Sequence, residues 1–413
     1  MEKLVKAVEL SGKIAIPPSK SDGQRAVLSA GLAAGSSTII NIGQSNDELA
    51  MMRNVQEFGA KVEISDGQLN IDGSIAFPIV AEFNCGESGL GLRLITSICA
   101  VFEGKHTLTG EGSILNRSQS FFTEEFPAMG MEVISNNAHL PITLSGHLIP
   151  GVYKVDGSQS SQYISGLLMA LPLLKGDSEI IVDELKSKSY VGMTLATLST
   201  FGIKIKVDNN RYFIAGNQFY SPTTYTVESD WSSASCWLVA AALGQKIELS
   251  GLSISSKQAD VAMLDALNSA NCMVEFLKDS IRVDGDRRRA FNFDATDCPD
   301  LFPALVVLAV GCQGKSILKG VRRLKNKESD RGIVLQQEYR KLGVTIEIHE
   351  DEMYVFGGAI LKSGVVDSHN DHRIAMCLGI TGTFIEEGIT IKHAEAVAKS
   401  YPDFWEHLNE VSI

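Results

Sequence analysis

The sequence predicts an α/β protein of two domains, each containing three copies of one repeated unit. Six apolar helices are preceded by small or polar residues, and these helix starts recur every 68 to 72 residues. They fall near Lys20, Ser88, Ser160, Ser232, Asp300 and Asp371. Recurrence at a fixed period indicates one supersecondary unit used repeatedly. Six units in 413 residues suggest two domains of three.

Each copy is expected to run helix, strand, helix and then two paired strands. In the first copy these elements cover residues 24–34, 37–42, 46–58, 61–64 and 68–71. Asn46 is a candidate N-cap of the second helix, with Glu48 in the first turn. The last two strands are expected to pair across the turn Ser65-Asp66-Gly67.

The second helix of five copies is expected to end at a residue in the left-handed conformation. Glycine stands before an alternating strand in four of these copies, and asparagine takes its place in the fourth copy. These residues are Gly59, Gly130, Gly202, Asn271 and Gly343. Glycine tolerates positive φ, and asparagine is its usual substitute. The sixth copy is cut short at Ile413.

The domain boundaries are predicted where the chain crosses over. Residues 1–13 read as a strand that precedes the first copy and belongs with copies four to six. One domain is therefore expected over 1–13 and 228–413, and the other over 14–227. No low-complexity linker marks a crossover, which favours a short two-strand hinge. A cleft between two such domains is a natural ligand site.

The bulk composition argues against several classes of protein. The formal net charge of −12 disfavours a nucleic-acid-binding surface. The N-terminal residues lack the apolar segment of a signal peptide, and no apolar run is long enough to span a bilayer. Seven scattered cysteines without a CxxC pair fit a reducing cytoplasm and buried thiols. The eight histidines show no metal-binding spacing.

Three of the predicted helix starts carry groups suited to anions. They are 18–25, with Lys20 and Arg25; the glycine-rich segment 86–93; and the serine-rich segment 158–162. Helix N-termini offer free N–H groups and a partial positive charge, which suit phosphate or carboxylate. Each motif also has a structural explanation, because a capping loop, a tight strand-to-helix turn or a serine N-cap has the same composition.

The second half of the chain carries a denser set of charges. Asp300 precedes a strongly apolar helix, the segment 325–331 alternates in charge, and 370–373 reads Asn-Asp-His-Arg. Lys399 adds a cation near the C-terminus. Alternating charges on a helix usually form a solvated face. These charges, however, lie at the starts of copies or at crossovers, as the other motifs do.

Together, these motifs resemble those of the 5-enolpyruvylshikimate-3-phosphate synthase family, from Lys13 to about Phe404 and in the family's order. The resemblance implies two domains of three βαβαββ units each, an inside-out α/β barrel, closing over substrates in the cleft. It implies transfer of the enolpyruvyl group of phosphoenolpyruvate to the 5-hydroxyl of shikimate 3-phosphate, with release of phosphate. This reaction belongs to the shikimate pathway to chorismate and the aromatic amino acids. The family needs no metal or organic cofactor, and a cytoplasmic monomer without nucleic-acid or membrane partners is expected.

The resemblance also implies roles for individual residues. The implied acid–base groups are Asp300, Glu328 and Lys20. The residues implied to bind shikimate 3-phosphate are Lys20, Ser21, Arg25, Ser160, Ser161, Gln162, Ser187, Tyr190, Asp300 and Lys327. Those implied to bind phosphoenolpyruvate are Lys20, Gly89, Arg117, Gln162, Arg331, Arg373 and Lys399.

These residue types suit the reaction. A carboxylate such as Asp300 can take the proton of the attacking 5-hydroxyl, while Glu328 or Lys20 can supply a proton to the methylene carbon. Arginine and lysine can stabilise the charge on the departing phosphate, and bidentate arginine matches carboxylate and phosphate geometry. The division of acid–base roles among these three groups is left open by the sequence.

The chain departs from the family's usual motifs at several positions. Gly23-Gln24 replaces Ser-Asn, and the run 87–90, Glu-Ser-Gly-Leu, replaces Asn-Ala-Gly-Thr. Prolines that are common in the family are replaced by Leu94, Ser118 and Ser189. The charged groups remain, so activity is expected. At least partial inhibition by glyphosate is also expected, since Gly89 leaves room for it, although Leu90 could shift the helix and weaken its binding.

Three rival functions would use the same fold. The sister enzyme that moves enolpyruvate onto UDP-N-acetylglucosamine uses a mobile loop with a reactive cysteine or aspartate, but the corresponding stretch 108–117 has no cysteine. A non-catalytic shikimate 3-phosphate-binding homologue is suggested by the departures in the glycine-rich turn. A nucleic-acid end-processing relative of the fold disagrees with the net charge of −12.

Overall fold

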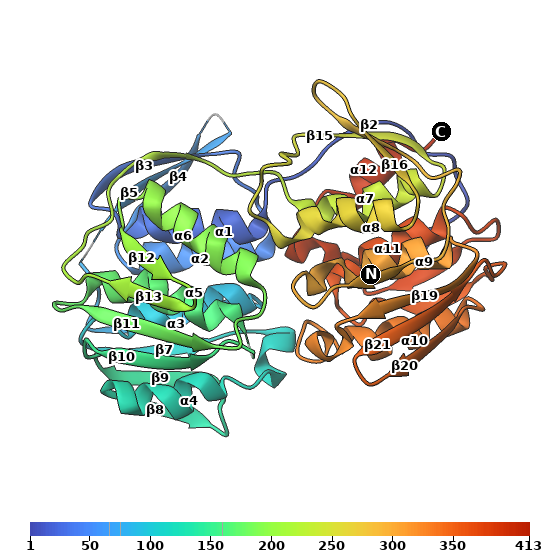
Figure 1. The fold of residues 1–413 in the computed structure, drawn as a ribbon. Coiled ribbons are helices and arrows are strands. Elements are labelled where there is room, and N and C mark those ends of the chain that lie inside the picture. Colours follow the sequence, from blue (N-terminus) through green and yellow to red (C-terminus); the bar gives the residue numbers. More distant parts are fainter. Residues whose placement is uncertain (66, 75, 159) are drawn as a thin grey trace. The chain divides into compact units, whose positions relative to one another are not determined.

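The structure, a computed structural model, describes residues 1–65, 67–74, 76–158 and 160–413. The chain forms two compact units (Figure 1). Met1–Pro17 and Glu228–Ile413 make up one, here called the split unit, and Pro18–Val227 makes up the other, the continuous unit. The first crossover thus lies later than the predicted 13–14, because the strand Ser11–Ala15 pairs with Lys246–Ser250 of the split unit.

The repeated unit has βαβαββ topology, which confirms the predicted mixed α/β fold. The second copy runs β6 (Val80–Asn84), α3 (Gly89–Cys99), β7 (Lys105–Thr109), α4 (Ser120–Glu125), β8 (Met131–Asn136) and β9 (His139–Gly146). Its sheet has the order β6-β7-β9-β8, in which β6 and β7 are parallel and the other neighbours antiparallel. A parallel pair needs a crossover connection, which α3 provides.

The continuous unit contains two further copies. The first has α1 (Lys20–Leu32), β3 (Gly35–Ile40), α2 (Asn46–Glu57), β4 (Lys61–Ser65) and β5 (Gln68–Gly73), and its remaining strand is β14 (Thr224–Thr226). The third has β10 (Val152–Asp156), α5 (Ser161–Ala170), β11 (Ser178–Asp183), α6 (Lys188–Thr200), β12 (Ile205–Asp208) and β13 (Arg211–Ile214). Because β14 pairs with β3, the two ends of this unit meet in one sheet.

The split unit repeats the arrangement. Its fourth copy has β2 (Ser11–Ala15), α7 (Trp231–Ala242), β15 (Lys246–Ser250), α8 (Met263–Ser269), β16 (Met273–Phe276) and β17 (Ile281–Asp284). The fifth has β18 (Asn292–Asp294), α9 (Phe302–Val310), β19 (Gly314–Lys319), α10 (Arg331–Lys341), β20 (Thr345–His349) and β21 (Glu352–Gly357). The sixth has β22 (Gly364–Asp367), α11 (His372–Gly382), β23 (Ile389–Lys392) and α12 (Phe404–Glu410).

The N-terminal segment completes the truncated sixth copy. β1 (Glu2–Val5) pairs antiparallel with β23, which is parallel to β22. β2 pairs instead with β15 of the fourth copy. The first residues therefore form two short strands in two sheets, and the prediction of one strand over 1–13 is wrong.

The ends of the second helices follow the prediction. Gly59, Gly130, Gly202, Asn271 and Gly343 all have positive φ, between 63° and 97°. The predicted N-cap Asn46 is wrong by one residue. Ser45 caps α2 and forms a capping box with Glu48, whose carboxylate accepts from the Ser45 N–H at 3.2 Å. Asp66, in the predicted hairpin turn, lies outside the described residues.

The first helix of each copy lies inside its unit. Every residue of α9 and α11 is buried, and in α5 every residue except Gln162 is buried. A helix that is apolar all round suits such a buried position. The first turns of these helices carry the unpaired N–H groups, so polar side chains gather there.

Two further observations concern composition. All seven cysteines are buried, as predicted. Among the described residues, no helix combines the length and apolar character needed to cross a membrane.

Candidate active site

The predicted site residues form two groups near helix starts, one in each unit. The continuous unit holds Lys20, Ser21, Arg25, Gly89, Arg117, Ser160, Ser161, Gln162, Ser187 and Tyr190. The split unit holds Asp300, Lys327, Glu328, Arg331, Arg373 and Lys399. Both groups therefore lie where backbone N–H groups and helix dipoles favour anions.

Side-chain hydrogen bonds join the starts of α1, α3 and α5. The Ser88 hydroxyl, at the N-cap of α3, donates to Gln24 Oε1 of α1 at 2.8 Å. Arg93 of α3 donates to Gln162 Oε1 of α5. Arg25 of α1 donates to Ser165 Oγ of α5 at 3.4 Å. The three helix starts of the continuous unit thus converge.

Lys20 is held by an ion pair. Its Nζ lies 2.9 Å from Asp47 Oδ2, and the two side chains are 12% and 4% exposed. Asp47 lies in the first turn of α2, beside the capping-box residue Glu48. Burial raises the pKa of Glu48 to about 7. Asp47 is not among the predicted site residues, because nothing in the order of residues shows that α2 starts beside Lys20.

Arg25 is buried and connects two other predicted residues. Its guanidinium donates to the carbonyl oxygens of Ser21 at 2.6 Å and Tyr190 at 3.3 Å, and to Thr194 Oγ1 at 2.8 Å. Burial lowers the pKa of Arg25 to about 10. Arg25 therefore orders the backbone at Ser21 and Tyr190, both predicted to bind the same substrate as Arg25.

Gly89, the first residue of α3, lies between two arginines. A Cβ at this position would be 3.0 Å from Arg93 Nη1 and 3.1 Å from Arg117 Nη1. The missing side chain therefore lets two guanidinium groups approach one helix start. Arg93 ends the glycine-rich segment but is not among the predicted site residues. Leu90 packs into the hydrophobic core of the continuous unit.

The serine-rich segment opens α5. Ser160 Oγ accepts from the Gln162 N–H at 3.3 Å, so Ser160 is an N-cap, as the structural explanation proposed. Ser161 begins the helix and is 5% exposed. Ser187 precedes α6 with φ 54°, a left-handed conformation that is uncommon outside glycine. Gln159 lies outside the described residues.

Arg331 is the centre of the charged group in the split unit. It begins α10, is 1% exposed and donates to three carboxylates. The distances are 2.8 Å to Asp371, 2.7 Å to Asp300 and 2.6 Å to Glu328. Burial opposes the charge, yet these carboxylates raise the pKa of Arg331 well above its usual value. The starts of α9, α10 and α11 are therefore tied together.

Asp300 in turn gathers three cations. Its carboxylate accepts from Lys327 Nζ at 3.1 Å, Arg331 Nη1 at 2.7 Å and Arg373 Nη2 at 3.4 Å. Burial favours the neutral acid, but Lys327, Arg373 and Arg331 hold the pKa of Asp300 well below its usual value. The three cations therefore hold Asp300 in its ionised form at neutral pH.

Asp371 and Asp260 support this group without having been predicted. Asp371 caps α11 by accepting from the Arg373 N–H at 3.0 Å. Asp260 is 1% exposed and accepts from the hydroxyl of Ser232, in the first turn of α7. Burial, followed by the nearby charge of Asp300, raises the pKa of Asp260 to about 7. Lys399 ends the 3-10 helix Ala394–Lys399 and is 5% exposed.

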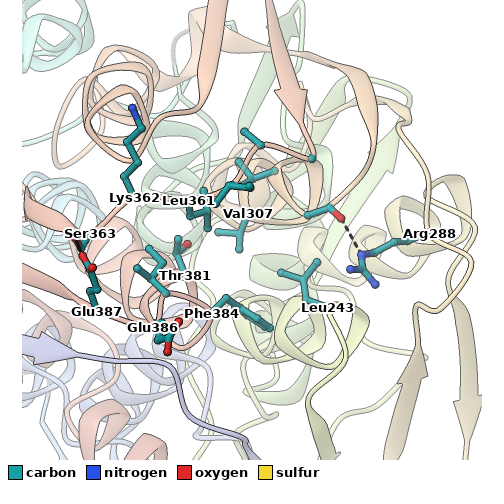
Figure 2. A pocket seen from close by; sticks show the side chains of 16 residues that line it. Leu243, Arg288, Val307, Leu361, Lys362, Ser363, Thr381, Phe384, Glu386 and Glu387 are labelled. Atoms are coloured by element: carbon teal, nitrogen blue, oxygen red, sulfur yellow. Dashed lines mark hydrogen bonds between the residues drawn. The ribbon is translucent and has the colours of Figure 1, made fainter.

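A pocket of about 870 Å³ in the split unit lies at the other ends of the same helices (Figure 2). Leu243, Val310 and Thr381 line it, at or near the C-terminal ends of α7, α9 and α11. On its wall, Arg288 donates to the Gly311 carbonyl at 2.8 Å. None of the predicted site residues lines this pocket. The charged helix starts, and not this cavity, are the candidate active site.

The chain is similar to known proteins over nearly its whole length. The 3-phosphoshikimate 1-carboxyvinyltransferase of Clostridium novyi (strain NT) is 37% identical over 415 residues, which cover 98% of this chain and 95% of the relative. The enzyme of that name from Clostridium perfringens (strain SM101 / Type A) is 37% identical over 412 residues, covering 98% and 96%. The structure of EPSP synthase from Acinetobacter baumannii superposes with a TM-score of 0.83 at 24% identity, over 100% of this chain and 98% of that one.

The sequence model described as EPSP synthase (3-phosphoshikimate 1-carboxyvinyltransferase) matches residues 5–408. This match spans both units and includes every residue of the two groups described above. The chain therefore belongs to the EPSP synthase family.

Proposed function

We propose that this chain transfers the enolpyruvyl group of phosphoenolpyruvate to the 5-hydroxyl of shikimate 3-phosphate and releases phosphate. The relatives named 3-phosphoshikimate 1-carboxyvinyltransferase support this activity. The observation that carries the proposal is the partly buried group in which Lys327, Arg331 and Arg373 surround the carboxylate of Asp300. Such a group supplies positive charge for anionic substrates and a carboxylate for proton transfer.

Asp300 is assigned as the base in this proposal. The oxygen of the 5-hydroxyl attacks C2 of phosphoenolpyruvate, and its proton passes to Asp300. In the protein without substrates, three cations surround Asp300, and its low pKa makes it a weak base. Anionic substrate groups that bind Lys327, Arg331 or Arg373 would neutralise those cations and raise the pKa of Asp300. Substrate binding itself would thus activate the base.

Glu328 or Lys20 is assigned as the acid. C3 of phosphoenolpyruvate gains a proton as C2 is attacked, which gives a tetrahedral ketal phosphate. The bond from C2 to the phosphate oxygen then breaks, phosphate leaves, and C3 loses a proton to restore the double bond. Glu328 is held by Arg331 at 2.6 Å and Lys20 by Asp47 at 2.9 Å, so both groups have an ordered position.

The substrate contacts follow the two groups of residues. Ser160, Ser161 and Ser187, with Lys327, are proposed to bind the 3-phosphate, and Ser21, Arg25, Gln162, Tyr190 and Asp300 to complete the shikimate site. Lys20, Gly89, Arg117, Gln162, Arg331, Arg373 and Lys399 are proposed to bind phosphoenolpyruvate. The converging starts of α1, α3 and α5 support the assignments in the continuous unit. A location in the reducing cytoplasm is also proposed, supported by the seven buried, unbridged cysteines. The chain is further proposed to act as a monomer.

Turnover in D₂O tests the addition–elimination route. Because C3 is protonated and deprotonated in each cycle, the methylene group of the product is expected to contain deuterium, detectable by mass spectrometry. Product without deuterium would contradict the ketal intermediate. A protein that binds shikimate 3-phosphate but forms no product would instead be the non-catalytic homologue.

A further inference from the structure

We propose that Gln24 is a positioning residue that locks the turn before Gly89 to the helix carrying Lys20 and Arg25. This inference rests on the proposed function, in which α1 contributes to both substrate sites and the start of α3 to phosphoenolpyruvate binding. Gln24 would then hold the phosphoenolpyruvate half-site in place against α1.

Gln24 connects two helix starts through one side chain. It is fully buried, with 0% exposure. Its Oε1 accepts from the Ser88 hydroxyl at 2.8 Å, and its Nε2 donates to the carbonyl of Lys20 at 3.4 Å. The amide therefore joins the backbone of one proposed catalytic residue to the N-cap of the neighbouring helix.

Ser88 passes this constraint to Gly89. Its Oγ accepts from the Gly91 N–H at 3.0 Å, and its only hydroxyl hydrogen goes to Gln24. Ser88 is 1% exposed, so solvent offers little alternative for that hydrogen. The next residue is Gly89, where an added Cβ would be 3.0 Å from Arg93 Nη1 and 3.1 Å from Arg117 Nη1. A small movement of the cap would therefore reach the guanidinium groups.

Gly91 makes room for this arrangement. A Cβ at this position would be 3.0 Å from Gln24 Oε1 and 3.0 Å from Ser88 Oγ. A side chain as long as glutamine fits at position 24 because residue 91 has none. The departures at 24 and 88 from the family's usual motifs are thus in direct contact with each other. These two residues form one compensated arrangement rather than separate losses.

Steady-state kinetics of a Gln24→Met variant test the positioning role of Gln24. Methionine keeps the size of the side chain but removes both amide hydrogen bonds. The KM for phosphoenolpyruvate at saturating shikimate 3-phosphate is expected to rise about tenfold, the equivalent of one hydrogen bond of about 1.4 kcal/mol. The kcat and the calorimetric Kd for shikimate 3-phosphate are expected to stay within about twofold. Gln56→Met, an exposed position of α2, is the matched control.

A second pair of changes tests the contact itself. Gly91→Ala in the wild-type background presses a methyl group against both Gln24 Oε1 and Ser88 Oγ and is expected to raise the same KM about threefold. In a Gln24→Asn background the shorter side chain leaves space beside residue 91. Adding Gly91→Ala to this background is therefore expected to raise the KM for phosphoenolpyruvate by less than threefold. Strictly additive effects would overturn the proposed contact.

The outcomes separate this inference from the proposed function. Wild-type protein is assayed first, and no phosphate release with both substrates would contradict the function. If the wild type is active, two results would overturn the positioning role alone. One is an unchanged KM for phosphoenolpyruvate in Gln24→Met. The other is an equal loss of affinity for both substrates in that variant, together with a lower melting temperature. If Gln24→Met does not fold, Ser88→Ala removes the hydrogen bond from the other side and is judged by the same selective rise in KM.

Discussion

Replacing Asp300 by asparagine is the most informative single change in the proposed machinery. Asparagine keeps the shape of the side chain but removes the charge and the basic oxygen. A positioned base typically contributes about 10²–10⁴-fold to the rate. The kcat of Asp300→Asn is therefore expected to fall by about that factor, and Asp300→Ala is expected to do the same.

The structure also sets the expected effect on stability. Asp300 pairs with Lys327 at 3.1 Å, Arg331 at 2.7 Å and Arg373 at 3.4 Å. Arg331 keeps two other carboxylates, Asp371 and Glu328. The loss of stability at pH 7 is therefore expected to be about 1–3 kcal/mol, below the ~3–5 kcal/mol of a buried charge left with no partner. The variant should remain folded.

The effect on stability depends on pH with a definite sign. The pKa of folded Asp300 is depressed, so the group contributes stability that is complete above the unfolded pKa of about 3.9 and is lost as the pH falls further. The difference in the free energy of unfolding between the wild type and Asp300→Asn should therefore become smaller below pH 4.

The assay is phosphate release with both substrates, alongside thermal unfolding followed by circular dichroism. Asp294→Asn is the matched control, because Asp294 pairs with Lys319 at 3.0 Å but both side chains are 53% exposed. A wild-type rate in Asp300→Asn would refute the assigned role, and a variant that fails to fold at pH 7 would refute the stability argument.

Three further predictions follow from the continuous unit. Burial raises the pKa of Glu48 from 4.5 to about 7, so folding favours its protonated form, and the free energy of unfolding should fall by ~3 kcal/mol between pH 5 and pH 8. Urea unfolding should show this fall in the exposed control Glu57→Gln but not in Glu48→Gln. Identical pH profiles in the two variants would contradict the assignment. Gly89→Ala should raise the KM for phosphoenolpyruvate about tenfold, since its methyl group would displace Arg93 and Arg117, whereas Gly192→Ala, with no atom within 4 Å, should not. Glyphosate should compete at least partly with phosphoenolpyruvate, and a titration to ~10⁻³ M, a usual upper limit for substrate KM values, without competition would refute this.

Local features of the fold were predictable from sequence. The six helix starts and the left-handed residues Gly59 and Gly343 depend on interactions within a few residues, so the pattern shows them directly. The split of the N-terminal segment into β1 and β2 was not predictable. Those strands pair with β23 and β15, whose distance along the chain leaves no local trace.

The site shows the same division. Residues in the motifs, such as Arg331 and Gln162, lie at helix starts as expected, because their position depends on the local helix. Asp47, Asp260 and Gln24 act through contacts with distant segments, and periodicity carries no information about those contacts. The glycine at 91 explains the glutamine at 24 only once α1 and α3 are seen together.

The proposed function depends on which substrate accepts the enolpyruvyl group. The most direct measurement is phosphate release from phosphoenolpyruvate by the wild-type protein, with shikimate 3-phosphate or UDP-N-acetylglucosamine as the second substrate. Release with shikimate 3-phosphate alone is predicted. Release with UDP-N-acetylglucosamine, or none with either acceptor in folded protein that binds shikimate 3-phosphate, would contradict the account.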